Sequence, residues 1–224
     1  MNAVTIIPPG QETSGEYHRS GAWGSTLIGH FRHSPRLAHL IHSGAYRPKP
    51  TAAMQFGTAF HTLMDPGGNF DTLYRVGPDV DHRTKAWKEA VASAEKDGVT
   101  LIGSDDHVDL LAMRASVLAN PVAAHLIEDA EHEVGFRMPS GYGNFTIQCR
   151  ADIFRRGDGI SDVKTCTDLD DFAASVTSWG YYRQAALIDI GQRTNANDWD
   201  DHHHAEVLEP PNWMLRSQPL ANVA

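Results

Sequence analysis

The chain contains little of what several protein classes require. Its two cysteines, Cys149 and Cys166, are too few for a disulfide-stapled fold or for a four-thiolate zinc or iron–sulfur site. No apolar run approaches the ~20 residues that a membrane helix needs, and the N-terminus has no basic segment of a signal peptide. We therefore expect a cytoplasmic protein with no membrane partner, in which both thiols are reduced.

Positive charge is also scarce, since 19 Lys and Arg residues face 28 Asp and Glu residues and give a net charge of -9. Proteins that coat nucleic acid through bulk electrostatics carry the opposite sign. The charge therefore argues against a plain DNA-binding module. It still allows an enzyme whose acids hold cations and whose arginines are locally clustered. With 224 residues, 41% of them hydrophobic, the chain is long enough for one sizeable domain.

Helical periodicity dominates the part of the chain before residue 131. Residues 1–15 are rich in Pro, Gly and polar residues, so we expect an irregular segment there. A 3.6-residue period, with proline and glycine breaks, then predicts helices over 24–41 (interrupted at Pro35), from Ala52 to Pro66, over 82–98, over 104–121 and over 121–130. Ser25 and Ser104 are the expected N-caps. In the helix over 104–121, the apolar stripe Val108, Leu111, Ala115 and Leu118 is expected to face the core.

The period changes to two in the second half of the chain. Alternation predicts strands over 132–138 and 144–152, joined by the turn "SGYGN", and the turn "RRGDG" leads into a third run, "GISDVKT" (159–165). A final helix is expected over about 170–190. This order predicts an α/β fold with α+β character, in which helices flank a central mixed sheet containing antiparallel hairpins.

The acidic residue and the lysine of "GISDVKT" are the first candidates for chemistry. Chance alone supplies such an acid-x-Lys pair about every other time in a chain of this composition, so the surroundings must carry the argument. Alternation places Asp162 and Lys164 on one face of a strand, and a hairpin through "RRGDG" brings Asp152 near Asp162. Two carboxylates and the carbonyl of Val163 would form an all-oxygen site that suits Mg²⁺. A neighbouring lysine can orient water or stabilise a phosphate oxygen.

The spacing D-(x9)-D-x-K over Asp152, Asp162 and Lys164 resembles that of the PD-(D/E)xK nuclease superfamily. Further pieces resemble its RecB-like branch and, within it, the RecE-like exonuclease VIII type of phage exonuclease. They are "FGTAFHTLM", "RTKAWKEA", "ANPVAAHLI", "CRAD", "DVKT" and "YYRQAAL", in this order. The resemblance covers roughly residues 15–190. It implies a restriction-endonuclease-like core over 16–190, followed by an atypical polar C-terminal tail over 191–224.

The resemblance also implies a role for each matching residue. Asp152, Asp162 and Lys164 would be catalytic. The metal ligands would be Asp152, Asp162, the Val163 carbonyl, His61 and Glu133, and the substrate contacts would be Arg150, Gln184 and Tyr182. Other interpretations stay open at this point. Glu131 competes with Glu133, Arg150 can be an ion partner of Asp152, and the histidine run "DDHHHAE" is better explained as a solvated tail.

The family implies a Mg²⁺-dependent exonuclease, with Mn²⁺ as an alternative ion, that digests double-stranded DNA ends from 5′ to 3′. It would act as a ring-shaped homo-oligomer with a RecT-like single-strand annealing protein in phage-type recombination, in the bacterial host cytoplasm. Two alternatives remain: a structure-specific or CRISPR-adaptation-like nuclease, and a catalytically reduced DNA-end-binding regulatory protein. Two positions depart from the family. A tyrosine expected four residues after Gln184 is Ile188, and the tail lacks the usual apolar strand.

Overall fold

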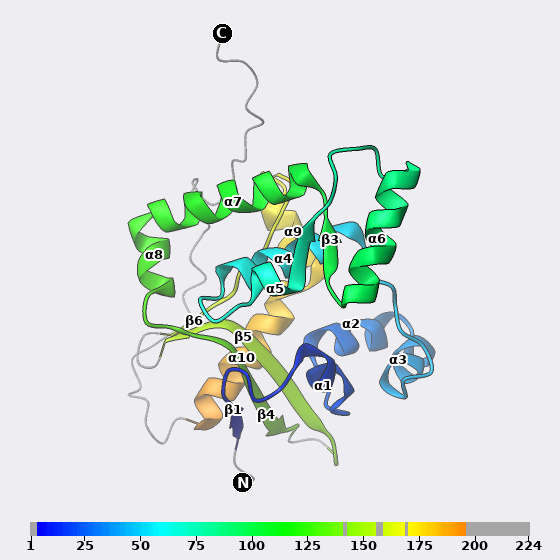
Figure 1. Cartoon of the computed structure of the whole chain (residues 1–224). Coiled ribbons are helices and arrows are strands. Elements are labelled where there is room, and N and C mark those ends of the chain that lie inside the picture. The colour runs from blue at the N-terminus through cyan, green and yellow to red at the C-terminus, as the bar shows by residue number, and fades with distance from the viewer. Residues whose placement is uncertain (1–3, 141–142, 156–158, 169, 196–224) are drawn as a thin grey trace. The chain divides into compact units, whose positions relative to one another are not determined.

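The computed structural model describes residues 4–140, 143–155, 159–168 and 170–195 (Figure 1). These residues form two compact units. The first contains the described residues of Met1–Lys49 and Leu126–Pro211, and the second contains those of Pro50–His125. The single domain that the sequence predicts over 16–190 stays a prediction, and the described residues of that range belong to both units. The fold class itself, a mixture of helices and strands, is confirmed.

The first unit is built on a four-stranded sheet in the order β1-β4-β5-β6, in which all neighbouring strands are antiparallel. Its elements are β1 (Thr5–Ile7), α1 (Ser14–Arg19), α2 (Ser25–His33), α3 (Pro35–His42), β4 (Glu131–Pro139), β5 (Thr146–Arg155), β6 (Gly159–Ser161), α9 (Phe172–Trp179) and α10 (Tyr181–Asn195). The break predicted at Pro35 is confirmed, because Ser34 caps α3 and Pro35 begins it.

Strand β1 corrects the expectation that residues 1–15 are irregular. Thr5, Ile6 and Ile7 pair with β4, and Ile7 lies opposite Gly135. A Cβ atom at position 135 would lie 3.1 Å from the Cβ of Ile7, so a glycine there lets the two strands approach closely. Three residues are too few to show a period of two, which explains why the sequence did not reveal this strand.

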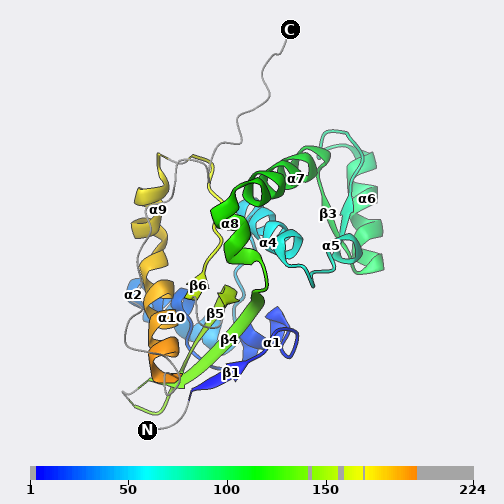
Figure 2. The ribbon, with the colours of Figure 1, turned by 90° about the vertical axis from the view of Figure 1, so that its left-hand side faces the viewer.

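The core of the first unit lies between the sheet and α10. Figure 2 shows α10 running alongside β4 and β5. The side chains of this cluster are Val134, Phe136, Met138, Cys149, Ala151, Phe154, Leu187 and Ile188. The alternation predicted for β4 and β5 is therefore confirmed. Ile188, which replaces the tyrosine of the resembled family, is a core residue here and is only 5% exposed.

The final helix is two helices rather than the one expected over 170–190. Gly180 ends α9 with a left-handed backbone (φ 70°), and α10 begins at the next residue. A Cβ atom at position 180 would lie 2.1 Å from the guanidinium carbon of Arg183. Both the backbone angle and the lack of space favour glycine at the break.

The second unit contains helices and one parallel strand pair, β2 with β3. Its elements are α4 (Ala52–Met64), α5 (Phe70–Leu73), β2 (Tyr74–Val76), α6 (Lys85–Asp97), β3 (Thr100–Ile102) and α7 (Ser104–Ala119), and α8 (Pro121–Ile127) continues past its boundary. The predicted helices are confirmed, and Gly98 closes α6 with a left-handed backbone (φ 73°). The sequence missed α5 and the two short strands.

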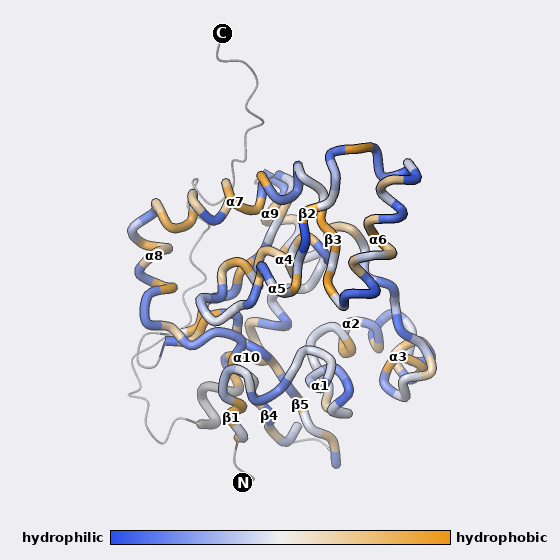
Figure 3. The backbone as a smooth tube through the Cα atoms, viewed as in Figure 1, coloured by the Kyte–Doolittle hydropathy of each residue, from blue (hydrophilic) through white to orange (hydrophobic). Residues whose placement is uncertain are grey.

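Helix α7 turns a different side to the core than expected. Its buried residue is Leu110, whereas Val108, Leu111 and Leu118 are 62%, 44% and 43% exposed. Figure 3 shows that hydrophobic and hydrophilic residues alternate along this helix, which explains why the direction was misread. The expected caps are also shifted by one residue. Gly24 and Gly103 hold the N-cap positions, and Ser25 and Ser104 are the first helical residues.

Among the described residues, no single helix is long and apolar enough to cross a membrane. Helices α7 and α8 reach the required length only when taken together, and they are bent by 97° at their junction.

Candidate metal centre

Three carboxylates lie in a row across β4, β5 and the end of β6. His132 pairs with Ile153 and Val134 pairs with Ala151, so the register places Glu133 opposite Asp152. Oxygen atoms of these two carboxylates lie within 4.8 Å of each other. Ile153 pairs with Ser161, so the next position places Asp162 opposite Asp152. The same register puts Glu131 opposite Phe154, so Glu133 is the acid of β4 that faces Asp152.

Glu133 adopts a backbone conformation that is unusual for a side chain of this type. Its φ is 57°, in the left-handed region that glycine and asparagine adopt most readily. Such a residue costs of order 1–3 kcal/mol and persists only where the surrounding structure holds it in place. The strain lies at the position where β4 faces Asp152, so it coincides with the row of carboxylates.

Asp152 is the most enclosed acid of the row, with a side chain that is 12% exposed. Its Oδ2 accepts a hydrogen bond from the Val163 N–H at 2.7 Å. The pKa of Asp152 is raised well above its ordinary value, mainly by burial and next by the nearby charge of Asp162. The carboxylate is therefore costly to ionise until a further positive charge approaches.

Lys164 contacts the oxygen atoms that the sequence assigned to a metal ion. Its Nζ forms an ion pair with Asp162, donates a hydrogen bond to the Val163 carbonyl at 3.2 Å, and lies 3.7 Å from Asp152 Oδ2. Beyond the strand, Gln184 Nε2 on α10 donates to Asp162 Oδ1 at 2.8 Å. The structure thus brings together Asp152, Asp162, Val163, Lys164 and Gln184. One departure is that β6 ends at Ser161, so Asp162 and Lys164 lie just beyond the strand.

Arg150 is held by two glutamates rather than by Asp152. Its Nη1 donates to Glu133 Oε2 at 3.2 Å, and its Nη2 lies 3.8 Å from Glu12 Oε2. The guanidinium also lies over the Tyr17 ring, 4.2 Å from the centroid. Arg150 is therefore an ion partner of acidic side chains, but these are Glu133 and Glu12 instead of the expected Asp152. Its phosphate contact stays a prediction.

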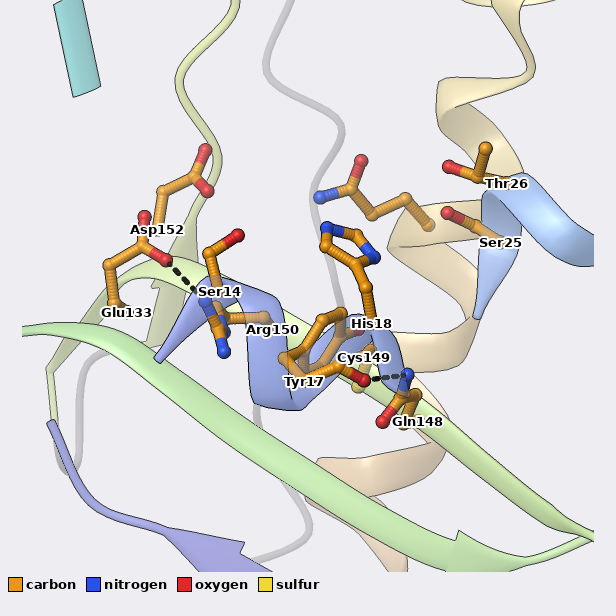
Figure 4. Close-up of a pocket in the computed structure, with 11 residues that line it drawn as sticks. Ser14, Tyr17, His18, Ser25, Thr26, Glu133, Gln148, Cys149, Arg150 and Asp152 are labelled. Carbon is orange, nitrogen blue, oxygen red and sulfur yellow. Dashed lines mark hydrogen bonds and ion pairs between the residues drawn. The ribbon is translucent and has the colours of Figure 1, made fainter. Parts of the chain in front are cut away.

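Arg150, Glu133 and Tyr17 border a pocket of about 250 Å³ in the first unit. Figure 4 shows Glu133 and Asp152 on one side of it and Ser25 and Thr26 on the other. The described residues that line it are Ser14, Tyr17, His18, Ser25, Thr26, Glu133, Gln148, Cys149, Arg150, Asp152 and Gln184. The pKa of His18 is lowered mainly by burial and next by the charge of Arg150, which favours the neutral imidazole. The pocket borders Glu133 and Asp152, two of the three carboxylates of the acidic row (Glu133, Asp152 and Asp162).

Sequence reasoning missed the N-terminal half of this pocket. Gln148 is 4% exposed, and its side chain accepts from Ser20 Oγ at 2.8 Å and donates to the Tyr17 carbonyl at 3.0 Å. Gln148 could have been found from the sequence, because it is a polar residue on the same strand face as Arg150 and Asp152. Glu12 and Tyr17 gave no such signal, since their contacts here join residues far apart in the chain.

The remaining predicted site residues come from other elements. His61 is a partly buried residue of α4 in the second unit, and its role as a metal ligand stays a prediction. Tyr182, at the start of α10, is 48% exposed and does not line the pocket. The run "DDHHHAE" and the rest of the tail beyond residue 195 lie outside the described residues, as do parts of the turns "SGYGN" and "RRGDG".

The donor set suits a hard divalent cation. Glu133, Asp152 and Asp162 provide carboxylate oxygens and Val163 a carbonyl oxygen, which are the ligand types that Mg²⁺ and Mn²⁺ prefer. The ammonium of Lys164 already contacts three of these oxygens, which indicates that the edge favours a positive charge. The raised pKa of Asp152 points to the same need.

No protein-family model, no curated protein and no solved structure matches the chain. The family resemblance therefore rests on the sequence motifs, and the geometry of the acidic row stands on its own.

Proposed function

We propose that the protein is a divalent-metal-dependent deoxyribonuclease with a restriction-endonuclease-like core. The observation that carries the proposal is the convergence of Asp152, Asp162 and the Val163 carbonyl around the Lys164 ammonium. Carboxylates on adjacent strands, a backbone carbonyl and one lysine are the groups that metal-assisted phosphodiester hydrolysis uses. The motif order of the sequence supports an exonuclease of the RecE-like type.

In this proposal, Asp152, Asp162 and the Val163 carbonyl would hold Mg²⁺ or Mn²⁺, and Glu133 and His61 would complete the ligand set. A bound ion would supply Lewis-acid polarisation of the scissile phosphate and of the attacking water. Lys164 moves from its ion pair with Asp162 to a phosphate oxygen or to the water, and stabilises negative charge as it develops. Gln184 fixes the orientation of the Asp162 carboxylate through its hydrogen bond to Oδ1.

Arg150, Gln184 and Tyr182 are the proposed contacts to substrate. The motifs support double-stranded DNA ends as the substrate, with digestion from 5′ to 3′. They also support a ring-shaped homo-oligomer and a RecT-like annealing partner in phage-type recombination, in the bacterial cytoplasm.

The proposal is tested with linear duplex DNA labelled at either the 5′ or the 3′ end. We expect the wild-type protein with Mg²⁺ to release nucleotides from the 5′ end, and Lys164→Ala to release none while still binding DNA. EDTA should stop the reaction, and Mn²⁺ should restore it. A wild-type protein as inert as Lys164→Ala, yet still able to bind DNA, would instead support a binding or regulatory protein. Cleavage of closed circles would favour an endonuclease.

A further inference from the structure

Two arginines from different helices meet at one tyrosine hydroxyl in the first unit. Arg32 on α2 donates from Nη1 to the Tyr182 hydroxyl oxygen at 3.1 Å, and Arg183 Nη1 donates to the same oxygen at 3.0 Å. A phenol is a neutral acceptor, so it compensates neither positive charge. In the part of the chain that the structure describes, no carboxylate lies within ion-pair distance of Arg32 or Arg183.

The guanidinium of Arg183 is held in a fixed position. A Cβ atom at Gly29 would lie 3.0 Å from its Nη2, and one at Gly180 would lie 2.1 Å from its Cζ, so the group fits only because both positions are glycine. Its Nη2 donates to the Trp179 carbonyl at 3.3 Å, and its Nε is buried without a hydrogen-bond partner. An oriented guanidinium that lacks an acidic partner is costly unless an anion binds to it.

The surrounding segment is basic, although the protein as a whole is acidic. One residue in eight of the whole chain is Asp or Glu, yet none occurs between positions 17 and 49. The same segment contains five cationic residues: Arg19, Arg32, Arg36, Arg47 and Lys49. The convergence of Arg32 and Arg183 is thus part of a local positive field, which attracts anionic ligands to this surface.

We infer that Arg32, Arg183 and Tyr182 form a phosphate-binding site for the backbone of a DNA strand, separate from the metal centre. Guanidinium groups bind phosphate oxygens through paired, charge-assisted hydrogen bonds, and two of them lie close enough here to share one phosphate. The Tyr182 hydroxyl holds the two groups together before the ligand arrives and adds a hydrogen bond to it. The choice of DNA as the source of the phosphate rests on the proposed function.

Helix α10 joins this site to the metal centre. Gln184, which bonds to Asp162, follows Tyr182 by two residues, and each residue adds about 1.5 Å along the helix axis. Each strand of duplex DNA carries a phosphate about every 3.4 Å along its axis. Residues two positions apart do not face the same side of a helix, so a strand that contacts both sites would pass around α10. The site would fix how far the strand advances relative to the acidic row.

The test measures DNA binding without turnover. A fluorescent linear duplex is titrated in EDTA, at several salt concentrations, with the wild-type protein, Arg32→Gln, Arg32→Lys and the matched control Arg114→Gln. Arg114 is an exposed arginine of α7 in the second unit. Arg32→Gln should weaken binding about tenfold at low salt and reduce the slope of log K against log salt by about 0.9. Arg32→Lys should keep the slope, because the positive charge stays, although a lysine cannot form the paired hydrogen bonds of a guanidinium. Arg114→Gln should change neither the affinity nor the slope.

Arg32 is chosen because its side chain is exposed, so its variants should fold, whereas Arg183 is packed between two glycines. The proposal is overturned if Arg32→Gln keeps the wild-type slope, if Arg114→Gln changes it equally, or if the wild-type protein does not bind DNA. Tight binding of inorganic phosphate with no change in the DNA slope would also overturn it, in favour of a small anion. Mg²⁺-dependent hydrolysis is measured separately. Absence of hydrolysis together with the expected slope change would refute only the proposed function.

Discussion

The acidic row and the arginine pair both border α10, yet they concentrate charge in opposite ways. The acidic row comprises Glu133, Asp152 and Asp162, and its most enclosed member, Asp152, is 12% exposed. The arginine pair, Arg32 and Arg183, is bridged by a half-exposed neutral phenol. Enclosed charges are weakly screened, whereas exposed charges are screened by water and salt. Changes at the acidic row should therefore have large effects, and changes at the arginine pair should have graded ones.

The largest contrast is expected for Lys164→Met. Hydrolysis should fall on the order of 10²–10³-fold, because no cation then stabilises charge on the phosphate. Binding of Mg²⁺ or Mn²⁺ should become about tenfold tighter, because the ammonium no longer occupies Asp162 and the Val163 carbonyl. Isothermal titration calorimetry measures the affinity, and Lys88→Met on the exposed side of α6 is the control. Unchanged metal affinity would show that Lys164 does not compete with the ion.

The second prediction concerns Asp152→Asn without metal. The pKa of Asp152 is raised in the folded state, so its contribution to stability is present below the unfolded pKa and is lost as the pH rises through the folded pKa. At neutral pH the variant should therefore melt higher, by about 2–4 °C for each kcal/mol relieved. Mg²⁺ should raise the melting temperature of the wild-type protein but not that of the variant. Asp109→Asn on α7 is the control, and a lower metal-free melting temperature for Asp152→Asn would contradict the account.

The smallest effect is expected at the arginine pair. Hydrogen bonds from Arg32 and then from Arg183 lower the pKa of Tyr182, since both favour the phenolate. Arg32→Gln should raise this pKa back toward its ordinary value, and Arg36→Gln on α3 should leave it unchanged. NMR titration of labelled tyrosine rings measures the shift, with Tyr182→Phe to assign the signal. If the signal titrates alike in the wild-type protein and Arg32→Gln, the two guanidinium groups do not converge in solution.

The helices and the two long strands were predictable because their signals are local. Proline at position 35, the apolar period of α4 and α6, and the alternation of β4 and β5 all lie within a few residues of the structure that they specify. Strands β1, β2 and β3 have three residues each, which is too short for a period, and their partners lie far along the chain. The direction of α7 was misread because apolar residues occur on both of its sides.

The centre of the site was predictable for a similar reason. A short turn and alternation place Asp152 near Asp162 in any antiparallel hairpin, and Lys164 follows on the same side. The choice between Glu131 and Glu133 needed the register of β4 against β5, which the sequence does not contain. The contacts of Arg150 could not be predicted from the local sequence, since its partner Glu12 lies far away along the chain.

The left-handed backbone at Glu133 has a consequence for anyone who redesigns this protein. A procedure that optimised the stability of this backbone would place glycine or asparagine at position 133, and a neutral residue at 152. Each choice would improve the scaffold and erase a carboxylate that faces a cation. The positions at which the natural sequence disagrees with its own backbone can therefore serve as a map of where selection acted on something other than folding.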